Sequence, residues 1–168
     1  MNRVKSLTKG KWTTTVDEVI AFERAHGIEL PESYRKAVLD LGYGLDHRNL
    51  SSLEDWCQPR LPEEMPDGFL RAPFPHSSAW NDRSQFSGGW DSPYFSVDHW
   101  SGAMRIVNLG CELYYVLVIT GPARGTIWLD GRADATGIVP LVDARGQHAD
   151  FETLFRGDSY VPTTSHSG

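Results

Sequence analysis

The first part of the chain repeats apolar residues with the period of an α-helix. Over residues 16–26, apolar side chains recur at spacings of three and four, which places them on one face of a helix. Thr15 and Glu18 have the spacing of a capping box, in which each side chain accepts a hydrogen bond from the backbone N–H of the other. Gly27 follows, and glycine commonly ends a helix because it tolerates a positive φ. The pattern predicts a helix from about Thr15 to His26.

A second helical pattern begins after Pro31. Proline suits the first turn of a helix because its missing N–H would have no partner there. Apolar residues then recur at helical spacing up to Leu41, and Gly42 can close the helix. The sequence therefore predicts a helix over about residues 32–41, which forms an αα-hairpin with the first helix.

Two strand patterns separated by a turn lie in the second half of the chain. Residues 113–120 are rich in β-branched and aromatic side chains, glycine and proline interrupt residues 121–125, and residues 126–130 form a second strand pattern. We predict a hairpin with a loop of about five residues. Because residues 114–119 show no polar alternation, we expect the first strand to be central and covered on both faces, with the helices covering one of them.

Weaker patterns complete a predicted α+β fold. Residues 104–109 are the expected neighbour of the central strand, and residues 138–142 form a strand that tolerates Pro140 only at a sheet edge. We also predict a short helix at residues 151–155 and a frayed tail at residues 162–168. Together these elements predict an αα-hairpin packed on a mixed, mainly antiparallel β-sheet.

The segment of residues 47–103 keeps no regular period and holds most of the ten prolines. We expect turns and short strands there. Ordering so long a segment costs roughly 1 to 2 kcal/mol of backbone entropy per residue, so buried side chains must hold it in place. The predicted anchors are nine aromatic residues: Trp56, Phe69, Phe74, Trp80, Phe86, Trp90, Tyr94, Phe95 and Trp100.

Length and charge narrow the class of protein. The 168 residues fit a single domain, predicted over residues 1–168 with its core at about residues 12–155. The chain has 22 acidic and 16 basic residues and a formal net charge of -6, which argues against direct binding of nucleic acid or membrane and favours a basic or neutral partner. No apolar leader is visible at the N-terminus, so we expect a cytoplasmic protein.

The sequence offers no motif for catalysis, cofactor binding or metal binding. The glycine-rich residues 121–125 join two strands and lack the lysine of a phosphate-binding loop, and the six histidines have no pair at chelating spacing. Cys57 and Cys111 do not form a Cys-x-x-Cys motif, and we expect reduced thiols, with Cys111 buried beside its apolar strand. We therefore predict no catalytic residue, no cofactor and no metal. The remaining enzyme hypothesis is a small hydrolase whose residues meet only in the folded chain.

Aromatic residues stand beside acidic residues in one part of the irregular segment. One interpretation is that the rings attach this segment to the sheet, because large rings are usually buried. The other is a surface that recognises a cationic protein, because tryptophan and tyrosine dominate binding hot spots. The candidate partner-binding residues are Trp80, Asp82, Trp90, Asp91, Tyr94, Asp98, His99 and Trp100.

Several sequence blocks, in order along the chain, resemble the SUKH superfamily. The N-terminal blocks Val16–Glu23, Gly27–Arg35 and Leu41–Gly44 are similar to its helix, Leu-Pro-x-x-Tyr, helix, Gly signature. Later blocks are similar to an actinobacterial-type branch of that superfamily: residues 72–75, 79–81, 109–111 and 118–128. The chain departs from the pattern at its C-terminus, where the aromatic helix is reduced to residues 151–155.

The resemblance implies binding rather than catalysis. Many bacterial SUKH proteins resemble immunity proteins of polymorphic toxin systems, and a yeast cell-wall synthesis regulator belongs to the same group. Our leading hypothesis is a non-enzymatic immunity protein that binds a cognate toxin domain, without direct contact to nucleic acid or membrane. The alternative is an intracellular scaffold or regulatory module of the same fold.

Overall fold

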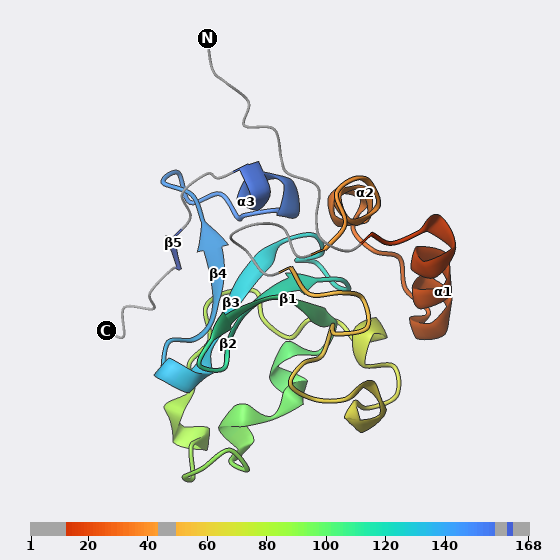
Figure 1. Cartoon of the computed structure of the whole chain (residues 1–168). Coiled ribbons are helices and arrows are strands. Elements are labelled where there is room, and N and C mark those ends of the chain that lie inside the picture. The colour runs from red at the N-terminus through yellow and green to blue at the C-terminus, as the bar shows by residue number, and fades with distance from the viewer. Residues whose placement is uncertain (1–12, 44–49, 157–160, 163–168) are drawn as a thin grey trace.

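The computed structural model describes residues 13–43, 50–156 and 161–162, and it has an α+β fold (Figure 1). Two helices come first, an irregular segment follows, and an antiparallel sheet with one further helix forms the rest. The helices are α1 (Val16–His26), α2 (Glu32–Asp40) and α3 (Phe151–Arg156). The strands are β1 (Ala103–Gly110), β2 (Leu113–Val118), β3 (Ile127–Gly131), β4 (Gly137–Val142) and β5 (Val161–Pro162).

Both N-terminal helices are confirmed. The Thr15 side chain accepts a hydrogen bond from Glu18 N at 3.2 Å, and Thr15 N donates to Glu18 Oε2 at 2.7 Å, which completes the predicted capping box. Gly27 ends α1 with a φ of 63°. The second helix follows Pro31 and ends at Asp40, one residue earlier than expected. Its buried face shares a core with the sheet.

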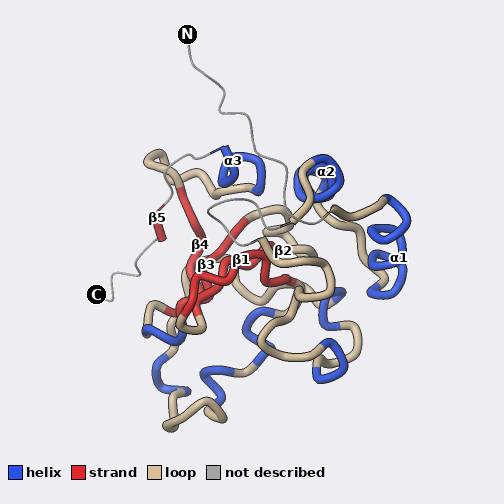
Figure 2. Tube along the Cα trace, in the orientation of Figure 1, coloured by secondary structure: helices blue, strands red, loops and turns tan. Residues whose placement is uncertain are grey.

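The sheet has the strand order β1-β2-β3-β4-β5, and each strand is antiparallel to its neighbours. Figure 2 shows the strands of this sheet in red. The expectation of a mixed sheet is therefore wrong. The connections from β1 to β4 are too short for a parallel crossover, which requires a dozen residues or more. The longer connection from β4 to β5 contains α3, and these two strands are also antiparallel neighbours. The predicted hairpin is confirmed as β2 and β3, with Val116 opposite Trp128.

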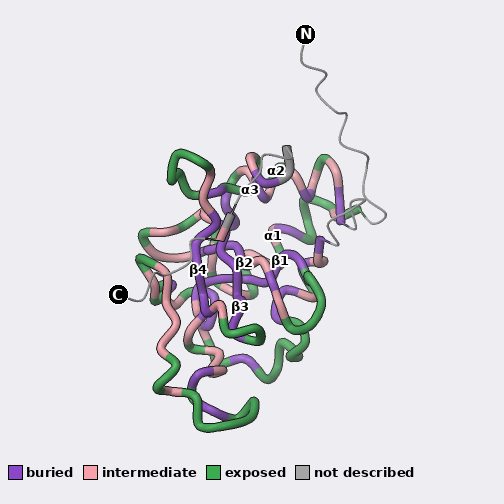
Figure 3. The backbone as a smooth tube through the Cα atoms, turned by 90° about the vertical axis from the view of Figure 1, so that its left-hand side faces the viewer, coloured by how far each residue is buried: buried purple, intermediate pink, exposed green. Residues whose placement is uncertain are grey.

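The central strand β2 is covered on both faces, as expected. Leu117 packs into the larger core, which also contains Val19 and Tyr34 of the helices. Val116 faces a smaller core on the other side, built around Phe74 and Trp128. Figure 3 shows the first four strands running through the buried centre of the molecule.

Strand β4 is confirmed, but it is not the outermost strand. Ile138 exchanges two backbone hydrogen bonds of 2.8 Å with Trp80 on the outer side of β4. Two residues later, Pro140 has its nitrogen on that same outer side, where no ladder hydrogen bond to β3 is lost. Pro162 belongs to β5 rather than to a frayed tail, and residues 163–168 lie outside the described part of the chain.

The irregular segment contains turns and five short 3-10 helices over residues 62–100. The prediction of short strands in this segment is wrong. Between residues 50 and 102, β-pairing is limited to isolated bridges at Leu50 and Trp80. Aromatic rings hold the segment instead. Trp56, Phe69 and Trp100 form a buried cluster, with the centroids of Phe69 and Trp100 4.7 Å apart. Among the described residues, no helix has the length and apolar character needed to cross a membrane.

Candidate functional site

Two of the predicted partner-binding residues are buried. Only 1% of Tyr94 and 1% of Trp100 is exposed, so neither ring is available to a partner, which corrects the sequence-based interpretation. Trp100 packs against Phe69 in the main core. The Tyr94 hydroxyl donates a 2.6 Å hydrogen bond to Asn81 Oδ1. These rings attach the irregular segment to the sheet.

Trp80 and His99 are half-buried and stack on each other, with ring centroids 4.0 Å apart. His76 continues the stack, and its Nε2 donates a 2.8 Å hydrogen bond to the His99 carbonyl. His99 Nε2 donates to Gln85 Oε1 at 3.1 Å. Burial lowers the pKa of His76 to about 4 and also lowers the pKa of His99. Both imidazoles are therefore neutral at pH 7, and they support the segment rather than offer a cation.

Asp82 also has a supporting role. Its carboxylate accepts hydrogen bonds from Ser84 N, from Ser84 Oγ and from Gln85 Nε2, at distances of 2.6 to 3.1 Å. These hydrogen bonds to Ser84 and Gln85 lower the pKa of Asp82. Asp82 therefore caps the 3-10 turn Arg83–Gln85 and, through Gln85, orients His99.

A cluster of two exposed rings and one half-buried ring, Phe95, remains, and we call it the aromatic face. Trp90 is 61% exposed and packs on Phe95 with centroids 4.5 Å apart, while Phe86 is 43% exposed and lies 6.1 Å from Phe95. Asp91 and Asp98 are exposed near these rings in the chain. The aromatic face therefore consists of Phe86, Trp90 and Phe95 with Asp91 and Asp98. The sequence analysis missed Phe86 and Phe95 as surface residues, although their spacing from Trp90 within one loop was a usable signal.

A buried charge network lies behind the aromatic face, and the sequence analysis missed it completely. Asp130 at the end of β3 is 2% exposed and lies between two guanidinium groups. Arg132 Nε donates to Asp130 Oδ1 at 2.8 Å, and Arg105 Nη2 of β1 donates to Asp130 Oδ2 at 3.2 Å. Burial opposes the charge of Asp130, but the hydrogen bonds and charge of Arg132, followed by those of Arg105, hold its pKa below the usual value.

This network attaches the aromatic face to the sheet. Arg132 Nη1 donates to the carbonyls of Tyr94 and Ser96, at 3.0 and 2.8 Å. Arg105 Nη1 donates to the carbonyl of Gln58. Two irregular stretches of backbone are therefore fixed to β1 and to the 3-10 turn that follows β3 by charge-assisted hydrogen bonds, which are roughly twice as strong as neutral ones.

A cavity of about 370 Å³ opens between the network and the aromatic face. Arg105 is part of its lining, and the guanidinium carbon lies 4.5 Å from the ring centroid of Trp100 and 4.0 Å from that of Tyr114. We call this cavity the arginine pocket. Its lining consists of Pro59, Arg60, Trp90, Phe95, Val97, Trp100, Arg105, Glu112, Asp130, Arg132 and Ala133.

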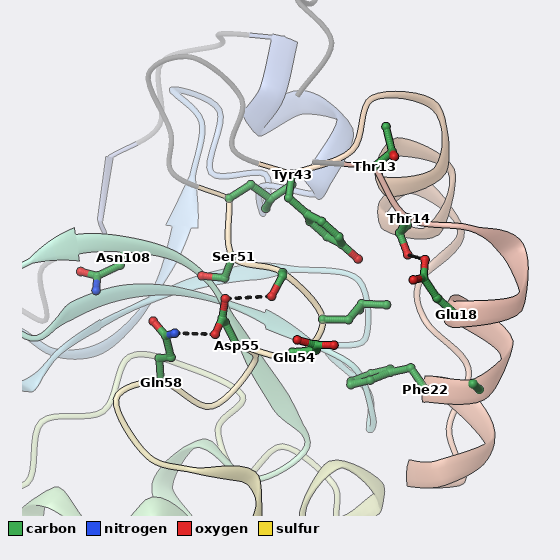
Figure 4. A pocket seen from close by; sticks show the side chains of 14 residues that line it. Thr13, Thr14, Glu18, Phe22, Tyr43, Ser51, Glu54, Asp55, Gln58 and Asn108 are labelled. Atoms are coloured by element: carbon green, nitrogen blue, oxygen red, sulfur yellow. Dashed lines mark hydrogen bonds between the residues drawn. The ribbon is translucent and has the colours of Figure 1, made fainter. Parts of the chain in front are cut away.

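A larger cavity of about 740 Å³ lies between α1 and the residues that follow Leu50 (Figure 4). Three carboxylates border it, those of Glu18, Glu54 and Asp55. Glu18 is already bound in the capping box, and Asp55 accepts hydrogen bonds from Ser52 Oγ and Gln58 Nε2. Among the described residues that line it, none is a histidine or a cysteine.

The two thiols differ in exposure. Cys57 is buried, and burial raises its pKa to about 11. Cys111 is exposed, contrary to expectation, because Cys111 and Glu112 form the turn between β1 and β2 with φ values of 53° and 59°. Within the described residues, no group of three histidine, cysteine, aspartate or glutamate side chains is placed to hold a metal ion.

Comparisons with protein-family models, curated proteins and solved structures found no match to this chain. Its function is therefore inferred from the geometry of the aromatic face and the arginine pocket.

Proposed function

We propose that this chain is a non-enzymatic protein-binding domain, and that its aromatic face is the binding surface. The observation that carries the proposal is the exposure of Trp90 on an anchored segment of irregular backbone. A surface tryptophan contributes most to binding when it is already ordered, because less conformational entropy is then lost in the complex. The Arg132 hydrogen bonds to Tyr94 and Ser96 supply that order.

The charge of the aromatic face indicates the kind of partner. Asp91 and Asp98 are exposed, and the whole chain has a net charge of -6. Such a surface attracts a basic partner and accelerates the encounter at low salt. A basic toxin domain, for instance a nuclease, fits this description.

The SUKH-like order of sequence blocks supports a more specific proposal, an immunity protein that binds a cognate polymorphic toxin in the cytoplasm. In this role the protein occludes its partner and makes or breaks no covalent bond. A scaffold or regulatory module with the same face would bind another protein and give no protection against a toxin.

A growth assay tests this proposal. Toxin-like domains encoded in the source genome are expressed in a host cell one at a time, with and without this chain. We expect growth arrest that the wild-type chain relieves. Trp90→Ala should weaken the complex by about 2 kcal/mol or more, roughly thirtyfold, and reduce protection. Val16→Ala removes a comparably exposed apolar side chain from α1 and is the matched control.

Full protection by Trp90→Ala and by Phe86→Ala, each with unchanged affinity, would remove the aromatic face from the binding surface. Lack of protection by the folded wild-type chain, when it nevertheless binds another host protein, would favour the regulatory alternative.

A further inference from the structure

We propose that the arginine pocket binds a single carboxylate group. This inference goes beyond the proposed protein partner, because it concerns a cavity next to the aromatic face and holds for a free organic acid as well as for an acidic side chain.

The balance of charge in the pocket is the first argument. Its lining contains three arginines, Arg60, Arg105 and Arg132, but only two carboxylates, Asp130 and Glu112. Arg105 and Arg132 are 8% and 4% exposed and share one buried carboxylate, that of Asp130. Two buried positive charges therefore face one buried negative charge. A buried charge is stabilised by a counter-ion, and one further negative charge would balance this site.

Unused hydrogen-bond donors are the second argument. A guanidinium has five N–H groups. Among the described residues, Nη1 and Nη2 of Arg105 have one acceptor each, Gln58 O and Asp130 Oδ2, so each keeps one N–H group without an acceptor. The guanidinium also lies over the rings of Trp100 and Tyr114, in cation–π contact with both. Arg105 is therefore oriented in advance, and a flat carboxylate matches its donor geometry.

The mouth of the pocket indicates what carries the carboxylate. Arg60 is exposed there, and its side chain forms no ion pair with any described residue. Trp90 and Phe95 provide an apolar wall. A ligand with one negative charge and an apolar or aromatic body fits this combination. A phosphate dianion carries more charge than the single excess positive charge of the lining.

The test uses benzoate and its neutral analogue benzamide as probes. Each is titrated into the full chain while the indole N–H signals of Trp90 and Trp100 are followed by NMR. We expect benzoate to shift these signals and to bind roughly tenfold more tightly than benzamide, because only benzoate forms charge-assisted hydrogen bonds. Equal binding of the two probes, or no shift with benzoate, would overturn the proposal.

Variants locate the binding. Arg60→Gln removes the exposed guanidinium at the mouth without disturbing the buried network, and we expect it to weaken benzoate binding about threefold to tenfold. Arg145→Gln, which changes an exposed arginine outside this lining, should leave binding unchanged. Arg105→Gln should abolish binding if the variant folds. If Arg105→Gln does not fold, Arg60→Gln still tests the assignment. Equal effects of Arg60→Gln and Arg145→Gln would contradict the assignment.

Titration with a peptide distinguishes the two sources of the carboxylate, and titration with phosphate tests the choice of a carboxylate. Acetyl-Ala-Glu-Ala-amide has only a side-chain carboxylate, and its glutamine analogue has none. Tighter binding of the glutamate peptide than of benzoate assigns the pocket to an acidic side chain of a partner protein, whereas the reverse order assigns it to a free organic acid. Inorganic phosphate that displaces benzoate at lower concentration would overturn the choice of carboxylate. These readouts need no toxin, so their failure is separate from failure of the growth assay.

Discussion

Asp130 is the residue on which the irregular segment depends most. It is buried, accepts hydrogen bonds from two guanidinium groups, and through Arg132 indirectly fixes the backbone at Tyr94 and Ser96. An isolated carboxylate in this place would be costly, and so would two isolated guanidinium groups. The network is stable only as a complete set of charges.

Asp130→Asn should therefore destabilise the protein strongly. The variant keeps the shape of the side chain but leaves two buried arginines without a counter-ion, and breaking such a pair typically costs about 3 to 5 kcal/mol. Urea denaturation measures the loss in the free energy of unfolding. Asp67→Asn, an exposed aspartate, is the control and should change it by less than about 0.5 kcal/mol. A similar small change for Asp130→Asn would show that the network contributes little.

The two tryptophans Trp90 and Trp100 should respond differently to truncation. Trp100 is 1% exposed, so Trp100→Ala leaves a large cavity and should cost about 3 to 5 kcal/mol. Trp90 is 61% exposed, and Trp90→Ala should cost less than about 1 kcal/mol. Thermal denaturation of both variants measures this. Equal shifts in melting temperature would contradict the burial of one and the exposure of the other.

The sequence around these residues does not distinguish them. Trp90 is followed by Asp91, and Trp100 is preceded by Asp98 and His99, so both have polar neighbours. Their burial depends on contacts with residues far away in the chain, such as Phe69 for Trp100. The Asp130 network was unpredictable for the same reason, because an aspartate at the end of a strand usually faces solvent.

The helices and the hairpin of β2 and β3 were predictable because local rules define them. These rules act over a few residues: a capping box, a proline in the first turn of a helix, and glycines that end a helix or form a turn. The structure contains the elements that they predict. The irregular segment follows no such rule. It is ordered by long-range contacts, for example the hydrogen bonds between Trp80 and Ile138. Short strands were therefore expected where the chain forms isolated bridges and 3-10 turns.

Gly137 shows how tightly β4 is fitted to the irregular segment. It has a φ of 86°, and a Cβ at this position would lie 2.3 Å from the Trp80 carbonyl oxygen. Gly146 has a similar φ of 77°, but a Cβ there would meet nothing within 4 Å. The two glycines separate the cost of backbone strain from the cost of collision.

Gly146→Ala should lower the free energy of unfolding by about 1 kcal/mol, because only the left-handed backbone conformation is unfavourable for alanine there. Gly137→Ala should cost roughly 3 kcal/mol, because the collision also separates β4 from Trp80. The denaturation midpoints of the two variants in urea provide the comparison. Equal midpoints would mean that the backbone at Trp80 moves away from residue 137 without loss of stability.

The histidine stack makes the stability of the whole molecule depend on pH. Burial holds the pKa of His76 at about 4 and lowers that of His99, whereas an unfolded histidine has a pKa of about 6.5. The unfolded chain therefore binds more protons in this range, and stability must fall as the pH decreases from about 6.5 towards 4. Above pH 6.5 the contribution of these two histidines to stability is fully present.

Urea unfolding at several pH values measures this loss. His76→Gln removes one of the titrating groups, and its stability should vary less between pH 6.5 and 4 than that of the wild type. A variant curve parallel to the wild-type curve would exclude His76 as a source of the dependence.

The contrast between the two thiols has a practical consequence for labelling. Cys111 is exposed at the turn between β1 and β2, next to Glu112 on the rim of the arginine pocket, whereas Cys57 is buried with its pKa raised to about 11. Because only an accessible thiolate reacts readily, a maleimide dye should attach to the native chain at one position and leave Cys57 unmodified until denaturant is added. Mass spectrometry of the labelled peptides tests this selectivity. A single fluorophore would then report directly on whatever enters or covers the adjacent rim.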